Sequence, residues 1–280
     1  MPSNRTQRRL DLLRSTIHDL ESVLVGFSGG LDSTFLLAVA VETLGADRAV
    51  AATVTGPIFP RRESYESRHL ARMLGAEQII VEAADLDDER FTANPPDRCY
   101  YCKRGIFARL LGVARERGLK HVIDGTNADD DRDYRPGLRA CRELGVEHPL
   151  AAVGMGKADI RALSAEMGLP TRDKPPGACL ASRIPYGETI TLAKLERIDK
   201  AEEALRELGF RQLRVRSHGD VARIEVTPQE SIARMLDDRT RVTVVAELKE
   251  LGFHYVALDL EGYRRGSMNV GLNDDSSHAG

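Results

Sequence analysis

The chain has 280 residues, of which 42% are hydrophobic and 30% are charged, and its formal net charge is -3. A chain of this length buries about three quarters of its unfolded surface and forms one large or two modest domains. This composition is typical of a globular protein. The balance of 40 basic and 43 acidic residues gives no general attraction to nucleic acid or to a membrane surface.

The N-terminal residues 1–20 are charged and lack the apolar core of a secretory signal. No apolar run of about 18 residues is present, which excludes a membrane-spanning helix. These features predict a cytoplasmic protein with neither a membrane nor a nucleic acid as partner. In that compartment thiols are expected to be catalytic or metal-binding rather than disulfide-bonded. The cysteines are Cys99, Cys102, Cys141 and Cys179.

Residues 1–170 alternate short apolar runs with helical stretches. Strands are expected at 23–27, 49–55, 78–81 and 121–123, and helices at 33–44, 62–74 and 101–117. This alternation predicts parallel strands joined by helical crossovers. Because the strands are apolar on both faces, we expect helices to cover both sides of the sheet.

The pattern changes after Gly187. A helix is expected at 192–208, strands at 211–216, 222–226 and 255–259, and helices at 229–236 and 239–251. We therefore predict an α/β domain at 1–180 and a smaller α+β domain for substrate binding or oligomerisation at 181–272. The boundary is expected in the Pro- and Gly-rich loop 170–187, and residues 273–280 are expected to be a disordered tail.

The segment SGGLDS, residues 28–33, joins the first strand directly to the first helix. Its glycines allow a tight turn that points consecutive N–H groups at one anion, and the helix start adds the positive end of a dipole. The serine hydroxyls can donate to phosphate oxygens, whereas the aspartate requires an intervening Mg²⁺ ion. The alternative is an ordinary glycine turn with a capped helix. The predicted pyrophosphate-binding residues are Ser28, Gly29, Gly30, Asp32 and Ser33.

The run GFSGGLDS lacks the lysine of the Walker motif and resembles the signature of the PP-loop ATP pyrophosphatases. That superfamily includes NAD and GMP synthetases and several tRNA-sulfur enzymes. The resemblance implies an adenine nucleotide α-hydrolase-like, Rossmann-like fold that cleaves ATP between its α and β phosphates and transfers AMP to a substrate. Mg²⁺ and the loop amides would neutralise the developing charge.

Two further segments are expected at the same sheet edge. Residues 51–55, which include Thr53, end the second strand, where the superfamily contacts adenosine through backbone groups; Thr53 is therefore a predicted ATP-binding residue. DGTNADD, residues 124–130, follows the fourth strand, so we predict Asp124 and Asn127 as ATP-binding residues. Asp130 is predicted to act with Asp32 in catalysis, and Asp124 or Asp130 is expected to bind Mg²⁺. The alternative for this segment is an Asx turn and a helix cap.

The cysteines fall into two groups. Cys99 and Cys102 form a C-x-x-C pair at the start of a predicted helix, which suits one metal centre or a redox pair. Cys179 lies in PPGACLASR, residues 175–183, whose prolines and small residues predict a rigid, exposed loop. Basic residues near that loop favour a thiolate. Cys141 occupies a helical position and is interpreted as a packing residue.

The segment DKPPGACLASRIPYGETIT, residues 173–191, resembles the LarE family of sulfur transferases, as do DGTNADD, RPG at 135–137, HPL at 148–150 and RVRSHGDVARIEV from residue 214. LarE proteins mature the nickel-pincer nucleotide cofactor of lactate racemase. The resemblance implies adenylation of each carboxylate of pyridinium-3,5-biscarboxylate mononucleotide, followed by conversion to a thiocarboxylate. It also implies homo-hexamers and a supply of sulfide or of a sulfur-donor protein.

The resemblance leaves two sulfur sources. In some LarE members the cysteine matching Cys179 gives up its own sulfur and becomes dehydroalanine. Others hold a [4Fe-4S] cluster on three cysteines, which match Cys99, Cys102 and Cys179. This chain has all three, so the resemblance implies the cluster. The alternative is a structural, zinc-binding or incidental C-x-x-C pair with Cys179 as the sacrificial donor.

Two arginines are candidates for holding the substrate. Arg214 and Arg216 alternate on a predicted strand and therefore face one side. Guanidinium groups suit bidentate hydrogen bonds to phosphate, and the resemblance implies that the mononucleotide phosphate binds here. The alternative is a pair of solvated arginines on a sheet face.

Three other functions fit parts of the sequence. A PP-loop tRNA thiolase also combines C-x-x-C, a third cysteine and a cluster, but it predicts a basic RNA footprint and an added nucleic-acid module. An amidating ligase would use ammonia and would leave Cys179 dispensable. An inactive nucleotide-binding protein would release neither AMP nor pyrophosphate.

Overall fold

The computed structural model describes residues 2–83, 85–130, 136–175, 177–227, 229–264 and 266–268. The chain divides into two units. The first contains Met1–Asp85 and Asp97–Gly177, and the second contains Leu86–Pro96 and Ala178–Gly280. Over the described ranges no helix is both long enough and apolar enough to cross a membrane. The predicted tail, 273–280, lies outside the described residues.

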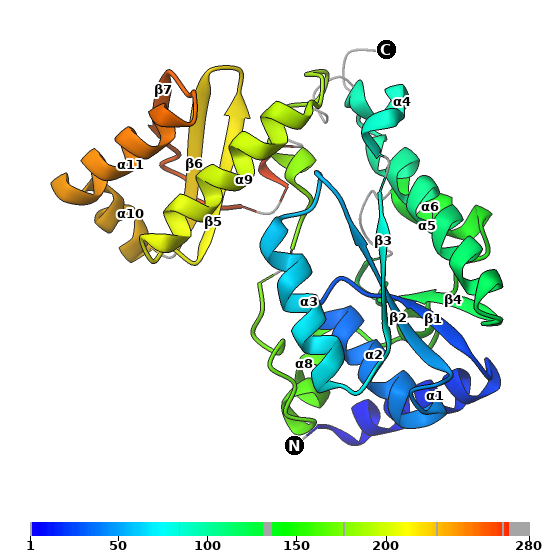
Figure 1. The fold of residues 1–280 in the computed structure, drawn as a ribbon. Coiled ribbons are helices and arrows are strands. Elements are labelled where there is room, and N and C mark those ends of the chain that lie inside the picture. Colours follow the sequence, from blue (N-terminus) through cyan, green and yellow to red (C-terminus); the bar gives the residue numbers. More distant parts are fainter. Residues whose placement is uncertain are drawn as a thin grey trace, which may run out of the picture. The chain divides into compact units, whose positions relative to one another are not determined.

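The first unit is built on a four-stranded sheet in the order β3-β2-β1-β4, and every pair is parallel (Figure 1). The strands are β1 Val23–Gly26, β2 Ala49–Thr55, β3 Gln78–Glu82 and β4 His121–Asp124. Val23 is in register with both Ala49 and His121, so the carboxyl ends of β1, β2 and β4 meet at one edge.

Helices cover both faces of this sheet. They are α1 Asn4–Asp19, α2 Leu31–Leu44, α3 Arg61–Met73, α5 Arg98–Glu116, α6 Pro136–Glu143, α7 Pro149–Ala152 and α8 Lys157–Glu166. Alternate residues of a strand point to opposite faces. Val23 and Val25 pack with α1, α2 and α8 in one apolar core, whereas Leu24 packs with α5 and α6 in the other. The expected parallel α/β fold is therefore confirmed.

The second unit contains a three-stranded sheet in the order β5-β6-β7. Its strands are β5 Gln212–His218, β6 Val221–Thr227 and β7 Tyr255–Leu258. Its helices are α4 Glu89–Thr92, η3 Leu180–Arg183, α9 Leu192–Glu207, α10 Gln229–Leu236 and α11 Asp238–Glu250. The short helix η1 Asp85–Asp87 spans the point in the sequence where the first unit passes into the second. β5 pairs with β6 in the antiparallel direction, and β7 pairs with β6 in the parallel direction. The expected smaller α+β region is confirmed.

One segment of the N-terminal half belongs to the second unit. Asn94 is fully buried with a positive φ of 57°, and its Nδ2 donates to the carbonyls of Pro185 at 2.6 Å and Glu188 at 3.0 Å. Ile190 N also donates to Thr92 O at 2.8 Å. These bonds join Leu86–Pro96 to the second unit, which the sequence did not indicate. Independent domains at 1–180 and 181–272 stay a prediction.

Candidate functional site

The segment 28–33 forms a tight loop between β1 and α2. Gly29 has a φ of +68°, and a Cβ there would lie 3.2 Å from Ser67 Cα, so only glycine fits without strain. The hydroxyls of Ser28 and Ser33 are 3.1 Å apart, and Gly30 N donates to Ser28 Oγ at 3.3 Å. The loop and the first turn of α2 thus present backbone N–H groups and the positive end of a buried helix, a geometry that binds phosphate.

Gly125 places the loop after β4 directly against this phosphate loop. A Cβ on Gly125 would lie 2.8 Å from Ser33 N and 3.1 Å from Ser33 Cα. Because those atoms are backbone, they cannot give way as a flexible side chain would. The DGTNADD segment therefore lies at the same sheet edge as residues 28–33.

Gly125→Ala is expected to weaken ATP binding by about five- to a hundredfold, because overpacking at a backbone contact costs about 1–3 kcal/mol. Calorimetric titration with a non-hydrolysable ATP analogue measures the effect. The control is Gly112→Ala in α5, where an added methyl group meets no atom within 4 Å. Unchanged affinity in Gly125→Ala would contradict the close approach.

Asp32 and Asp130 form the acidic part of the site. Burial raises the pKa of Asp32; the charge of Lys157 opposes this rise, and the charge of Asp130 adds to it. Asp32 Oδ1 is buried and no described residue donates to it within hydrogen-bond distance, although Asn127 lies near enough to lower the pKa of Asp32. Asn127 is fully buried, and no described residue accepts a hydrogen bond from its Nδ2 within hydrogen-bond distance. A buried carboxylate of this kind is stabilised by a cation, so the residues fit Mg²⁺.

The carboxylate of Asp124 makes several contacts that the sequence did not indicate. Its Oδ1 accepts hydrogen bonds from Thr126 N at 2.9 Å and from His148 Nδ1 at 2.7 Å, and Lys103 Nζ lies 3.8 Å from Oδ2. Burial raises the pKa of Asp124, but these partners outweigh it and lower the pKa to about 2. Asp124 is therefore ionised, and its role as an ATP ligand stays a prediction.

Thr53 is buried inside the sheet. Its hydroxyl donates to Phe27 O at 2.7 Å and accepts a hydrogen bond from Gln78 Nε2 at 2.7 Å. The side chain thus braces the end of β1 against β2 and β3. A contact of Thr53 with adenosine, which was expected through the backbone, stays a prediction.

The C-x-x-C pair occupies the first turn and a half of α5. Cys99 is exposed and Cys102 is half-buried, in the first unit, whereas Cys179 belongs to the second unit. Within each unit, the described residues include no group of three His, Cys, Asp or Glu side chains that could hold a metal ion. The three-cysteine set therefore stays a prediction. Cys141 is fully buried, which confirms it as a packing residue.

The loop at Cys179 is clamped by a buried ion pair. Arg183 Nη1 donates to the carbonyls of Ala178 at 2.6 Å and Cys179 at 2.8 Å. Its Nε and Nη2 donate to the two carboxylate oxygens of Glu202 at 2.9 and 3.1 Å. Pro175, Gly177 and Ala178 are exposed, as predicted for this loop, whereas Cys179 is half-buried and Arg183 is 1% exposed. The pairing with Glu202 draws the loop onto α9.

Arg214 and Arg216 share one face of β5, as predicted, but both are buried. Arg216 pairs with Glu225 at 2.7 Å and donates to Ser182 O at 3.1 Å, while its Nε has no hydrogen-bond partner among the described residues. Burial and the charge of Arg183 lower the pKa of Arg214. The alternative of two solvated arginines is therefore wrong. Binding of a phosphate here stays a prediction.

Several residues of the site were missed by the sequence analysis. Lys157 and Arg161 act on the pKa of Asp32, and their i, i+4 spacing on one helix was the available signal. Lys174 Nζ donates to Gly29 O at 2.8 Å. Glu202, which orders the Cys179 loop, gave no signal because it lies on an ordinary amphipathic helix.

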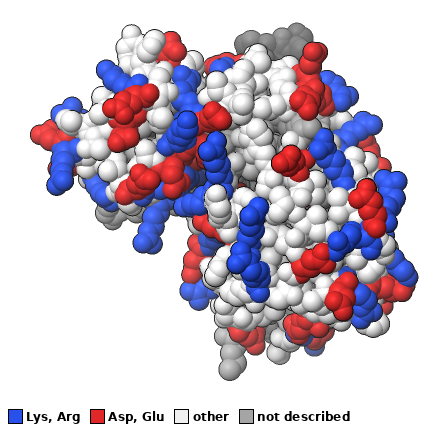
Figure 2. All heavy atoms as spheres, in the orientation of Figure 1, with Lys and Arg blue, Asp and Glu red and all other residues white. Residues whose placement is uncertain are grey.

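Basic and acidic side chains are interspersed on the face drawn in Figure 2. A nucleic-acid footprint requires basic side chains clustered on one face. The visible face therefore gives no support to RNA binding.

Comparison with known proteins identifies relatives over most of the chain. Residues 6–98 match the NAD synthase family. The chain is 41% identical to the uncharacterized protein slr1717 of Synechocystis over 94% of its own length and 97% of that protein. It is 40% identical to the pyridinium-3,5-bisthiocarboxylic acid mononucleotide synthase of Lactiplantibacillus plantarum, covering 92% of each chain. A tRNA-specific 2-thiouridylase of Xanthobacter autotrophicus is 27% identical over 64% of this chain and 55% of the relative.

Proposed function

The chain belongs to the LarE family of ATP-dependent PP-loop enzymes, and on that premise we propose that it converts the carboxylates of pyridinium-3,5-biscarboxylate mononucleotide into thiocarboxylates. The synthase of Lactiplantibacillus plantarum carries the name of the bisthiocarboxylic product. The chain spans nearly all of that relative, so both units have counterparts there. Cytoplasmic location and assembly into a homo-oligomer, a hexamer in LarE proteins, stay predictions.

The first step is adenylation at the phosphate loop. A carboxylate oxygen of the substrate attacks the α-phosphorus of ATP, the bond from that phosphorus to the β-bridging oxygen breaks, and pyrophosphate leaves. The amides of residues 28–33 and the N-terminus of α2 stabilise the departing pyrophosphate. Asp32 and Asp130 would hold Mg²⁺, which supplies charge neutralisation on the phosphates. The buried Asp32 Oδ1, without a hydrogen-bond partner in the described part of the chain, supports this assignment.

The observation that carries the proposal is the hydrogen bond between the Cys179 loop and Arg216 of β5 inside one unit, with Arg214 on the same face of that strand. Arg183 donates hydrogen bonds to both Cys179 O and the carboxylate of Glu202. Arg216 donates to Ser182 O, in the short helix that follows Cys179. Arg214 and Arg216 add buried positive charge beside that loop. A substrate phosphate on these guanidinium groups would keep its carboxylates within a fixed reach of Cys179.

We further propose that Cys99, Cys102 and Cys179 hold a [4Fe-4S] cluster. The thiols of Cys99 and Cys102 stand near the N-terminus of α5, where a thiolate is stabilised by the helix. The three thiolates would hold the cluster, which would supply sulfide for the exchange. Sulfur then bonds to the acyl carbon and AMP departs, with no net oxidation.

Anaerobic turnover tests the function. The protein is incubated with ATP, Mg²⁺, sulfide and the biscarboxylate mononucleotide, and mass spectrometry follows AMP and the exchange of oxygen for sulfur in the product. The corresponding bisamide mononucleotide, which lacks the attacking carboxylate, is the control and should yield no AMP. Thiolation of tRNA, or AMP release that the biscarboxylate does not stimulate, would sink the proposal.

The same incubation separates the two sulfur sources. With a cluster, the protein contains iron and sulfide, turns over repeatedly, and keeps its intact mass. Cys99→Ser with Cys102→Ser should then abolish repeated turnover. A colourless protein that makes at most one thiocarboxylate per chain and loses the elements of hydrogen sulfide would instead identify Cys179 as the sacrificial donor.

A further inference from the structure

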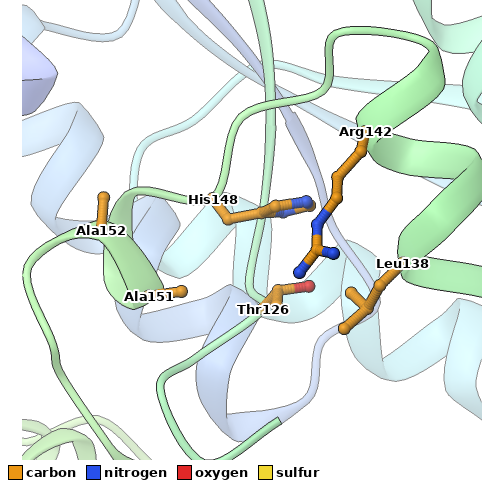
Figure 3. Close-up of a pocket in the computed structure, with 6 residues that line it drawn as sticks. All are labelled: Thr126, Leu138, Arg142, His148, Ala151 and Ala152. Atoms are coloured by element: carbon orange, nitrogen blue, oxygen red, sulfur yellow. The ribbon is translucent and has the colours of Figure 1, made fainter. Parts of the chain in front are cut away.

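The phosphate loop, residues 28–33, contains no lysine, so any basic side chain at this loop comes from another segment. Two basic residues of the first unit are directed elsewhere. Lys103 Nζ lies 3.8 Å from Asp124 Oδ2. Arg142 lines a pocket of about 330 Å³, and Figure 3 shows its guanidinium directed toward the imidazole of His148. Lys174, in contrast, is bonded to the backbone of the phosphate loop.

Lys174 is held between the phosphate loop and α3. Its Nζ donates to Gly29 O at 2.8 Å and lies 2.8 Å from Glu66 Oε2. Glu66 is itself fixed, because Arg62 Nε is 3.1 Å from its other carboxylate oxygen. Only 21% of the Lys174 side chain is exposed, so water shields these contacts less than it does on an open surface. The ammonium group therefore has a defined position against the carbonyl of Gly29.

The segment that carries Lys174 lies along α3. Lys174 pairs with Glu66, and a Cβ on Gly177 would lie 3.2 Å from Glu63 Oε1. Glu63 and Glu66 are three residues apart on one helix and therefore share a face. The helix thus contacts this segment at both ends of 174–177, and all of these residues belong to the first unit.

The carbonyl that Lys174 binds belongs to the peptide group between Gly29 and Gly30. A trans peptide is planar, so its C=O and N–H point in opposite directions. Gly30 N donates to Ser28 Oγ at 3.3 Å, which places the N–H on the side of the serine hydroxyls and Lys174 on the other side. Since both flanking residues are glycines, side chains do not restrict the rotation of this peptide group. The bond from Lys174 restricts it instead.

The charge of Lys174 also strengthens the N–H of Gly30 as a donor. Hydrogen bonds at the two ends of a peptide group polarise it in the same sense and reinforce each other. Pyrophosphate gains negative charge as its bond to the α-phosphorus breaks, so a donor already oriented toward it stabilises the transition state more than bound ATP. Lys174 can therefore act on pyrophosphate through the peptide group, without touching it.

We propose that Lys174 is a positioning residue for adenylation, which fixes and polarises the Gly29–Gly30 peptide so that Gly30 N–H stabilises the departing pyrophosphate. This role rests on adenylation at the phosphate loop, as proposed above, and is independent of the source of sulfur. The effect of Lys174 is expected on the step in which pyrophosphate leaves, and not on the binding of ATP.

Lys174→Met tests this role, because methionine keeps most of the aliphatic stem and removes the ammonium group. With the biscarboxylate mononucleotide as acceptor, the single-turnover rate of pyrophosphate release at saturating ATP should fall by about tenfold, the loss of one hydrogen bond to a charged group. The ATP concentration that gives half of this rate should change by less than about threefold, because the lost interaction acts in the transition state. Lys174→Arg keeps the charge and the donors and should recover most of the rate.

The matched control is Lys194→Met. Lys194 Nζ also donates to a backbone carbonyl, Thr189 O at 3.0 Å, and to a glutamate, Glu188 Oε2 at 3.3 Å, but it belongs to the second unit. This variant should release pyrophosphate at the rate of the unaltered protein. Lys174→Met is expected to stay folded, since Glu66 keeps Arg62 as its partner, and thermal unfolding checks this.

Nuclear magnetic resonance of the protein, isotope-labelled in its glycines, gives a readout that needs no acceptor substrate. Pyrophosphate with Mg²⁺ should shift the Gly30 amide proton downfield in the unaltered protein and in Lys174→Arg, and should shift it less in Lys174→Met. If the unaltered protein releases no pyrophosphate with the biscarboxylate, the proposed function fails, and this titration still tests Lys174.

Three outcomes would overturn the role of Lys174. The first is a Gly30 resonance that shifts equally in the unaltered protein and in Lys174→Met. The second is an equal single-turnover rate of the two proteins. The third is a loss of rate in Lys174→Met that saturating ATP restores, because Lys174 would then serve only to bind the nucleotide.

Discussion

The Cys179→Ala variant is expected to release AMP and pyrophosphate in the presence of the substrate but to make no thiocarboxylate. The residues described above around the phosphate loop belong to the first unit, whereas Cys179 belongs to the second. The substitution removes the attacking or cluster-binding sulfur and leaves adenylation intact. Product formation should fall below detection, while pyrophosphate release stays within a few-fold of the unaltered protein, because the acyl adenylate is then lost to water.

Cys141→Ala is the matched control for this experiment. Burial raises the pKa of the Cys141 thiol to about 11, so it stays protonated at neutral pH and cannot act as a nucleophile. The variant is expected to form thiocarboxylate normally. Full sulfur transfer by Cys179→Ala would refute both sulfur sources considered above. Full turnover of this variant with ammonia in place of sulfide would instead favour an amidating ligase.

Much of the fold could be predicted from local pattern. The apolar runs that form β1, β2 and β4 are buried on both faces, so their apolar composition is sufficient to predict them as strands. The glycine turn before α2 identified the phosphate loop. Helix α1 was missed, although Leu10, Leu13 and Ile17 have helical spacing and Ser3 caps the helix by accepting from Thr6 N.

The partners of the site residues could not be predicted in this way. The pairs Asp124–His148 and Arg183–Glu202 join positions that are distant in sequence. No local pattern distinguishes His148 from a surface histidine or Glu202 from a solvated helix residue, because only packing brings each to its partner. Asn94 likewise reads as a turn residue until the carbonyls that it contacts are in place.

Glu202→Gln is expected to lower the free energy of unfolding by about 3–5 kcal/mol at neutral pH, since it leaves a buried arginine without its counter-charge. Glu202 is fully buried and accepts hydrogen bonds from Arg183, from Arg206 Nη2 at 3.0 Å and from Val215 N at 3.2 Å. Glutamine keeps the shape but has one acceptor oxygen and no charge. Urea unfolding followed by circular dichroism measures the loss, and Glu203→Gln, at a half-exposed neighbouring position, should cost no more than about 1 kcal/mol.

The pH dependence of the stability difference between the unaltered protein and Glu202→Gln identifies the electrostatic origin of that difference. Burial raises the pKa of Glu202, but Arg183 and the neighbouring arginines outweigh it and bring the pKa from its ordinary 4.5 to about 2. A depressed pKa stabilises the fold above the ordinary value, and that contribution is lost as pH falls from 4.5 toward 2, at about 1.4 kcal/mol per pH unit. The gap between the unaltered protein and Glu202→Gln should therefore narrow by about 2 kcal/mol between pH 7 and pH 3. A gap that stays constant over this range would mean that packing, and not charge, holds the Cys179 loop on α9.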